Sequence, residues 1–302
     1  LMGDNLLTLL RSREYKGLPI RIVKHMTRDI LLGLQEMEMQ RIIHTDLKPE
    51  NILLSRLPEK RIQKIIDYKP LPKGGVSLVS IGLSGDLSGL TKAQQKRLRK
   101  KMEKIKLEGV QEPAEDIQSD AKSNDAQQLS DLLRQKEAHL VKIVDFGNAC
   151  FVDEPYSNDI QTRQYRSPEI ILGYTYDTKV DIWSLACIVF ELLTGDFLFQ
   201  SKAFKGCSRE EDHLALMGAY MGEFPQKLLS QGKHATKYFV PLKGKLKHGE
   251  RTSRTISGVL EKKYQFNLQE AAEVEDFLRP MLALDARNRS TPSQCLEHPW
   301  LA

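Results

Sequence analysis

The chain has 302 residues, of which 40% are hydrophobic and 28% charged, and this composition fits one large globular unit or two domains with a substantial core. The sequence shows no signal peptide and no run of eighteen apolar residues, so it predicts no transmembrane helix. The four cysteines have neither metal-ligand spacing nor regular pairing, and we expect reduced thiols in an intracellular protein.

The first motif along the chain is the run IIHTDLKPEN at residues 42–51. Phosphoryl transfer from ATP needs a carboxylate to orient the attacking hydroxyl, a cation on the phosphoryl group and oxygen ligands for Mg²⁺. Asp46, Lys48 and Asn51 would supply these groups from one short loop. An ordinary charged surface loop is the alternative interpretation.

The same run resembles the catalytic loop of protein kinases, whose pattern it follows along eight consecutive positions except at Thr45. Thr45 stands where most kinases carry arginine. The resemblance implies a structural role for His44. It also implies that Leu53, in the strand after the loop, forms the floor of the adenine pocket.

A long basic segment follows at residues 55–140. It contains 17 Lys and Arg against 12 Asp and Glu, whereas the rest of the chain has 28 of each, so the whole net charge of +5 lies in this segment. The breaker cluster KPLPKGG at residues 69–75 and the Ser, Gln, Asp and Lys that fill residues 116–131 predict that much of it is disordered. We expect it to be an insert in a hairpin that joins two strands, a connection where long insertions cost little closure entropy.

Residues 91–107 of the insert are mostly good helix formers that follow a Thr91 N-cap, and five of the six residues 96–101 are basic. A solvated charged helix is one interpretation. A signal for import or chaperone partners and a nucleic-acid patch are the others. No aromatic residues interleave the basic ones as stacking platforms, so direct nucleic-acid binding ranks last.

Asp145 opens the motif Asp-Phe-Gly directly after residues 141–144, which alternate like a short strand. A carboxylate at the end of a strand is free to bind a metal ion. Together with Asn51, Asp145 is therefore the predicted Mg²⁺ site, and both would also contact bound ATP.

Thr162 begins the run TRQYR, which resembles the segment that shapes the substrate pocket in the branch of mitogen-activated, cyclin-dependent and SR-protein kinases. The resemblance implies that its hydroxyl hydrogen-bonds Asp46 and Lys48 and links substrate docking to the catalytic base. A threonine that only stabilises a turn is the alternative.

Three further residues are predicted to be structural. Glu169, in the run SPE, and Arg289 resemble a buried ion pair of kinases. Asp181 either caps a helix or, as the resemblance implies, is buried and bonded to the backbone around the catalytic loop. Residues 182–193 are apolar enough for a core helix but too few to span a bilayer.

Several stretches together resemble the SR-protein kinases, which phosphorylate serines in Arg-Ser repeats of splicing factors. They are GDNLLTLLRSREYKGLP, IIHTDLKPENILL, VKIVDFGNACFVDEPYSNDIQTRQYRSPEIILG, DIWSLACIVFELLTGDFLF and REEDHLALMG, in that order, with the long split insert. The resemblance implies serine/threonine kinase activity with ATP and Mg²⁺, Arg-Ser-rich protein partners and a role in the regulation of mRNA splicing. It also implies movement between cytoplasm and nucleus that the insert governs.

A kinase for Arg-rich substrates should present carboxylates, because guanidinium groups bind them bidentately. Asp196, Glu211 and Asp212 resemble the acidic docking groove of the family. A helix start stabilised by its dipole explains residues 210–212 without any substrate. Ala219 stands where the family carries another groove glutamate, so docking is expected to be weaker.

The predicted fold is α+β: a mostly helical, kinase-like C-lobe with short β pairs around Asn51 and Asp145. The expected parts are residues 1–54 with hinge and catalytic loop, the insert at 55–140, and the rest of the C-lobe at 141–302. The motifs that cover the ATP phosphates precede the hinge in kinases and are not found here, so the chain is expected to lack the N-lobe.

Two functions follow from these residues. The first is a serine/threonine kinase of the SR-protein type. This chain would be a C-terminal fragment of it or the product of an incomplete gene model, and the complete protein would be active. The second is a catalytically deficient C-lobe that binds Arg-Ser-rich partners. We expect the 302-residue chain by itself to phosphorylate an Arg-Ser peptide at a negligible rate.

Overall fold

The structure is a computed structural model that describes residues 2–55 and 139–302, except 242 and 250. These residues all belong to one compact unit. The predictions for the insert, namely its disorder, the helix at 91–107 and the basic block at 96–101, concern residues outside the described ranges.

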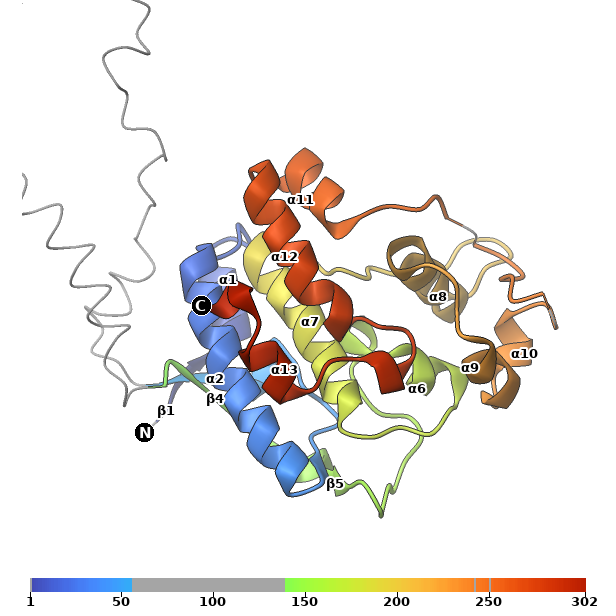
Figure 1. The fold of residues 1–302 in the computed structure, drawn as a ribbon, viewed down its shortest axis with the longest axis horizontal. Coiled ribbons are helices and arrows are strands. Elements are labelled where there is room, and N and C mark those ends of the chain that lie inside the picture. Colours follow the sequence, from blue (N-terminus) through green and yellow to red (C-terminus); the bar gives the residue numbers. More distant parts are fainter. Residues whose placement is uncertain (1, 56–138, 242, 250) are drawn as a thin grey trace, which may run out of the picture. The chain divides into compact units, whose positions relative to one another are not determined.

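Helices dominate the described part of the chain (Figure 1). They are α1 (Leu6–Ser12), α2 (Ile20–Met39), α6 (Pro168–Leu172), α7 (Lys179–Thr194), α8 (Arg209–Met221), α9 (Gln226–Gln231), α10 (Ala235–Tyr238), α11 (Ile256–Tyr264), α12 (Leu268–Met281) and α13 (Pro292–Leu296). Within the described ranges, none of the helices is both long and apolar enough to cross a membrane.

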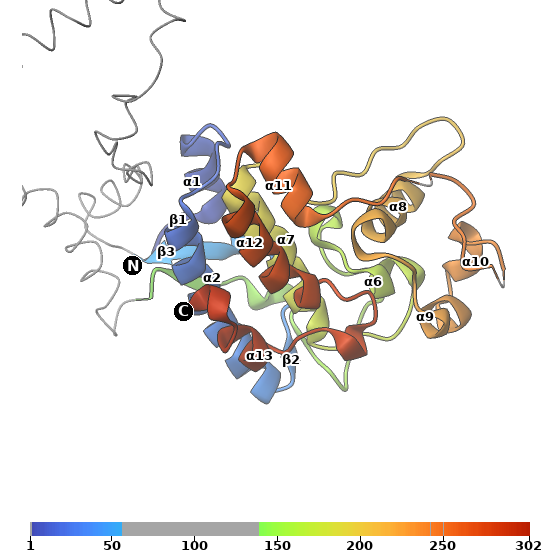
Figure 2. The ribbon, with the colours of Figure 1, turned by 45° about the horizontal axis from the view of Figure 1, so that its top comes forward.

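Helix α7 lies at the centre of the core, between α2 and α12 (Figures 1 and 2). Every residue from Val180 to Thr194 is buried, as expected for a helix that is apolar on all sides. The predicted core helix at residues 182–193 is thus confirmed. The helix ends at Gly195, whose φ of +81° lies in the left-handed region that glycine adopts most easily.

Within the described residues, five short strands form two small sheets. β1 (Met2–Asn5), β3 (Ile52–Ser55) and β4 (Val141–Ile143) make one antiparallel sheet in the order β1-β3-β4, and β2 (Ile42–Ile43) pairs with β5 (Cys150–Phe151). In the pair β3–β4, Ile52 lies opposite Ile143 and Leu54 opposite Val141. The β pairs expected beside Asn51 and Asp145 are therefore present, and the mixture of many helices with few strands agrees with the predicted fold class.

Candidate active site

The carboxylate of Asp46 lies between two side chains of the chain itself. Its Oδ2 accepts a hydrogen bond from Nζ of Lys48 at 2.5 Å, and its Oδ1 accepts one from the hydroxyl of Thr162 at 2.7 Å. The side chain of Asp46 is 17% exposed and that of Lys48 23%. A carboxylate held in this way keeps a fixed orientation and still reaches solvent.

A cavity of about 270 Å³ opens beside this carboxylate. It is lined by Thr45, Asp46, Asn148, Tyr156, Ser157, Asp159, Ile160, Gln161 and Thr162. The catalytic loop thus forms one wall and the segment before α6 the other. This cavity offers space for a hydroxyl-bearing side chain next to Asp46.

Contacts within the catalytic loop, from Asn51 and His44, hold the backbone of Asp46 in place. The side-chain amide of Asn51 donates to the carbonyl of Asp46 at 3.0 Å, and the amide of Asp46 donates to Nδ1 of His44 at 3.3 Å. His44 is fully buried, and its Nε2 lies 2.9 Å from the carbonyl of Val144. His44 therefore joins the catalytic loop to the end of β4, which fits its predicted structural role.

Asp181, in the first turn of α7, reaches the same loop from the core. Its carboxylate accepts the backbone N–H groups of His44 at 2.7 Å and Thr45 at 3.2 Å. The N-cap of α7 is Thr178, so Asp181 does not cap the helix. Burial raises the pKa of Asp181, while the facing His44 and the two N–H donors act in the opposite direction. These bonds hold Thr45 at a φ of +71°, a left-handed conformation that is costly for a β-branched residue.

Asp145 and Asn51 lie at adjacent ends of the β3–β4 pair, where the amide of Val144 donates to the carbonyl of Asn51 at 2.9 Å. Asp145 is exposed and has a φ of +67°. Among the residues that the structure describes, no group of three or more His, Cys, Asp or Glu side chains could hold a metal ion. Magnesium prefers few protein ligands together with phosphate oxygens and water. The carboxylate of Asp145 and the side-chain oxygen of Asn51 fit that preference.

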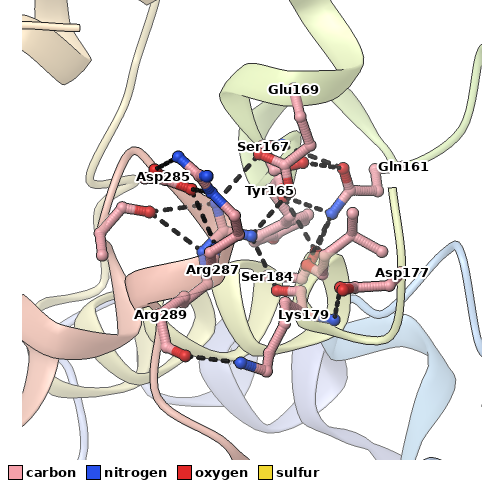
Figure 3. Close-up of polar contacts among 12 residues, drawn as sticks. Gln161, Tyr165, Ser167, Glu169, Asp177, Lys179, Ser184, Asp285, Arg287 and Arg289 are labelled. Carbon is pink, nitrogen blue, oxygen red and sulfur yellow. Dashed lines mark hydrogen bonds and ion pairs between the residues drawn. The ribbon is translucent and has the colours of Figure 1, made fainter. Parts of the chain in front are cut away.

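Gln161 connects the activation segment, residues 148–166, to both the catalytic loop and the core helix α7. Its backbone N–H donates to the carbonyl of Thr45 at 2.8 Å. Its side-chain NH₂ group donates to the hydroxyl of Ser184 and to the carbonyl of Val180, each at 2.9 Å. Its Oε1 accepts the amide and hydroxyl of Ser167, each at 3.0 Å (Figure 3). The sequence reading did not single out Gln161. Its place directly before Thr162 was the available signal.

Glu169 and Arg289 form a buried bidentate ion pair, with distances of 2.7 and 3.0 Å. The side chains are 2% and 0% exposed. Arg289 also donates to the carbonyls of Ala283 and Lys179, and its guanidinium lies over the ring of Trp183. The pair lies in the network of Figure 3 and fits the structural role predicted for both residues.

A second buried carboxylate, Glu191 on α7, was missed by the sequence analysis. The hydroxyl of Tyr165 donates to it at 2.6 Å. Burial raises the pKa of Glu191 to about 7, and the bond from Tyr165 opposes that rise. Its position within an apolar run gave no sign of this pairing.

The predicted docking residues all have partners within the chain. Asp196 accepts hydrogen bonds from Nζ of Lys263 and the hydroxyl of Tyr264, both at 2.8 Å, and the bond from Lys263 is the main reason that its pKa is lowered. Its side chain is 47% exposed. Asp196 therefore remains accessible to a ligand.

Glu211 and Asp212 do not present free carboxylates, contrary to our expectation. Glu211 forms a capping box with Ser208 at the start of α8. Asp212 is fully buried. Its carboxylate accepts hydrogen bonds from Nε of Arg251 at 2.9 Å and from the backbone N–H of Lys202 at 2.8 Å. A buried carboxylate needs such partners, and here the chain supplies them.

Leu53 is partly buried on β3, where it pairs with Asn5 and Lys142. Its predicted role as the adenine floor stays a prediction. The same holds for the catalytic, metal-binding and docking roles assigned above.

The sequence is similar to proteins of known family. The family described as "Protein kinase domain" matches residues 1–69 and 128–301. Serine/threonine-protein kinase SRPK of Physarum polycephalum is 39% identical over 100% of this chain and 65% of its own length. Protein kinase dsk1 of Schizosaccharomyces pombe is 30% identical over 99% of this chain and 64% of its own length. The SRSF protein kinase 3 of Homo sapiens is 39% identical over 53% of this chain and 28% of its own length. The chain therefore spans less than two thirds of the length of these relatives.

Proposed function

Because the chain belongs to the protein kinase family, we propose that the protein transfers the γ-phosphoryl group of ATP to serine hydroxyls of Arg-Ser-rich proteins of the splicing-factor type. The observation that carries this proposal is the carboxylate of Asp46, which Lys48 and Thr162 hold beside an open cavity. This arrangement suits a base that orients a hydroxyl.

In this mechanism each side chain has a separate task. Asp46 accepts a hydrogen bond from the substrate serine and orients its oxygen toward the phosphoryl group. Lys48 lies close enough to Asp46 to place its positive charge on the same phosphoryl group. Asn51 and Asp145 hold Mg²⁺, which when bound offsets the negative charge of the phosphates.

The substrate class rests on similarity and on charge. The human relative is named SRSF protein kinase 3, and the relative from Physarum polycephalum, similar over the whole chain, is named SRPK. Asp196 offers a partly exposed carboxylate to a substrate arginine. A second guanidinium reaches Asp212 only if Arg251 leaves it, so docking at that residue competes with an internal ion pair.

A phosphorylation assay with the natural protein at its full length tests the proposal. An Arg-Ser repeat peptide should be phosphorylated, and Asp46→Asn should lower kcat by about 10²–10⁴-fold because the base is lost. Asp153→Asn is a matched control, since Asp153 is an exposed acid whose hydrogen bonds and ion pair are with Arg41. A peptide with glutamine in place of each arginine should be a poor substrate.

Two outcomes would contradict the proposal. Unchanged turnover by Asp46→Asn would remove the base from the mechanism. Equal rates on the arginine and glutamine peptides would remove the substrate class. A binding module without catalysis, the other function considered from the sequence, has no observation in its favour.

We also propose that the protein occurs in both cytoplasm and nucleus. The support is the resemblance of the sequence to SR-protein kinases and the basic block at residues 96–101. Imaging of a tagged protein with that block replaced by Gln should show less nuclear signal. An unchanged distribution would contradict a role of the block.

A further inference from the structure

Asp29, on α2, contacts the point where the chain returns from residues 56–138 into β4. Its Oδ2 accepts the backbone N–H of Leu140 at 2.6 Å and of Val141 at 3.4 Å. Its Oδ1 lies 3.0 Å from Nδ1 of His139. The side chain of Asp29 is 14% exposed, so one largely buried carboxylate holds three consecutive residues.

Helix α2 contacts the other end of β4 one turn later. Gly33 follows Asp29 by four positions and therefore lies on the same face of the helix. A Cβ atom on Gly33 would lie 3.1 Å from Cδ1 of Ile143, so helix and strand approach closely at this position. The strand β4 is thus fixed by a polar contact at its start and by close packing at its end, and Figure 1 shows it alongside α2.

The place where β3 and β4 meet the long connection between them explains why such a contact is useful. Within the described residues, the backbone bond between β3 and β4 that lies nearest to the connection runs from the amide of Ser55 to the carbonyl of Leu140 at 2.8 Å. Beyond it, residues 56–138 close the connection, and a long connection adds closure entropy that opposes pairing. β4 is also a strand of only three residues at the edge of the sheet, paired on one side with β3, so few bonds of its own hold it in place. Contacts from α2 offset both effects at the point where pairing begins.

We propose that Asp29 is a positioning residue that anchors the returning strand of the hairpin to α2 and thereby fixes Asp145. Only Val144 separates the end of β4 from Asp145, so displacement of β4 displaces the predicted metal ligand. The part that concerns Asp145 as a ligand rests on the proposed function. The anchor itself rests on the contacts of Asp29.

Hydrogen exchange of the 302-residue chain tests the anchor without any need for activity. In Asp29→Ala, the amides of residues 140–143 should exchange at least 10-fold faster, while the amides of residues 182–193 in α7 keep their protection. Asp29→Asn should have a smaller effect, because its amide oxygen still accepts hydrogen bonds without the charge. Glu36→Gln, an exposed acid of the same helix that bonds to Gln40, is the matched control and should change neither region.

Unchanged protection at residues 140–143 in Asp29→Ala would overturn the proposal. So would an equal loss of protection in α7, because that result would describe a general loss of stability rather than a local anchor. The Asp29→Asn variant alters the side chain least, so it is the variant in which loss of the anchor is most easily distinguished from a failure to fold.

Kinetics of the natural full-length protein test the consequence for Asp145. Asp29→Ala should raise the Mg²⁺ concentration at half-maximal rate at least fivefold and leave KM for the Arg-Ser peptide within twofold. A rise in the peptide KM without a change in the Mg²⁺ requirement would contradict the positioning role. A wild-type protein without activity would contradict the proposed function, whereas the exchange experiment decides the anchor independently.

Discussion

A single hydroxyl, that of Thr162, links the activation segment to the carboxylate of Asp46. Thr162→Ala removes this bond and leaves the carboxylate of Asp46 held by Lys48 through Oδ2 but no longer by a partner at Oδ1. A hydrogen bond to a charged group contributes about 1.5–3 kcal/mol, so kcat/KM for an Arg-Ser peptide should fall about 10- to 100-fold. Steady-state kinetics with the natural protein would measure this change.

Thr162→Ser is the control for that prediction, because it keeps the hydroxyl and removes a methyl group. It should retain kcat/KM within about threefold. If the alanine variant were as fast as the wild type, Thr162 would be only a turn residue and its bond to Asp46 would have no part in catalysis.

Glu191 predicts a dependence of stability on pH. Its pKa is raised from an ordinary value of 4.5 to about 7 in the folded protein, chiefly by burial. The folded state therefore binds a proton more tightly than the unfolded state, and the free energy of unfolding falls as the pH rises from about 4.5 to about 7. A shift of this size corresponds to about 3 kcal/mol.

Urea unfolding at pH 5 and pH 8 would measure this contribution. Glu191→Gln has no titrating group, so its free energy of unfolding should change less between the two pH values than that of the wild type. Tyr165→Phe removes the hydrogen bond that lowers the pKa of Glu191 and should extend the pH window upward. Equal pH dependence in wild type and Glu191→Gln would show that other groups cause it.

At the level of the elements, the C-terminal end of α7 leaves no room for a side chain at Gly195. Gly195 has a φ of +81°, and a Cβ atom there would lie only 1.7 Å from the carbonyl oxygen of Tyr15. Gly195→Ala must therefore move the backbone after α1 or the end of α7. We expect a loss of about 3 kcal/mol in the free energy of unfolding, at the upper end of ordinary substitutions.

Gly206 offers a matched control for this prediction. Its φ of +83° is nearly the same, but a Cβ atom would meet nothing within 4 Å. Gly206→Ala should cost only the left-handed conformation, about 1 kcal/mol. Chemical denaturation of both variants separates the clash from the conformational cost, and equal losses would contradict the role of the contact with Tyr15.

The elements also show which parts of the site the sequence could predict. The catalytic loop and the Asp-Phe-Gly motif have their groups at fixed short spacings, so their residue types were sufficient to predict short β pairs beside Asn51 and Asp145. Helix α7 was predictable because a continuous apolar run is compatible only with burial on all sides.

The contacts of Gln161 and Asp29 were not predictable in the same way. The side chain of Gln161 bonds to the backbone carbonyl of Val180, and that of Asp29 to the backbone N–H of Leu140. Every residue has such backbone groups, so the residue types of the partners do not reveal these contacts. The burial of Asp212 was not predictable for a related reason. Its residue type suggested a surface charge, whereas Arg251, 39 positions later, makes it a buried ion pair.

At the largest scale, the pair Glu169–Arg289 joins segments that lie 120 positions apart in the chain. It ties α6, which follows the activation segment, to the loop between α12 and α13. Because both side chains are almost fully buried, removal of one leaves an uncompensated charge in the core. Arg289→Met should therefore lower the free energy of unfolding by about 3–5 kcal/mol.

The double variant Glu169→Leu with Arg289→Met distinguishes the cost of an unpaired charge from the value of the pair. Replacement of a buried ion pair by apolar residues of similar size is often far less damaging than the loss of one partner. The double variant should thus be more stable than Arg289→Met, although the carbonyls of Ala283 and Lys179 lose their donor in both. Thermal and urea unfolding of the three proteins would measure the difference. A double variant no more stable than the single one would mean that Arg289 acts mainly through those carbonyls and the ring of Trp183, and that its charge pairing with Glu169 is secondary.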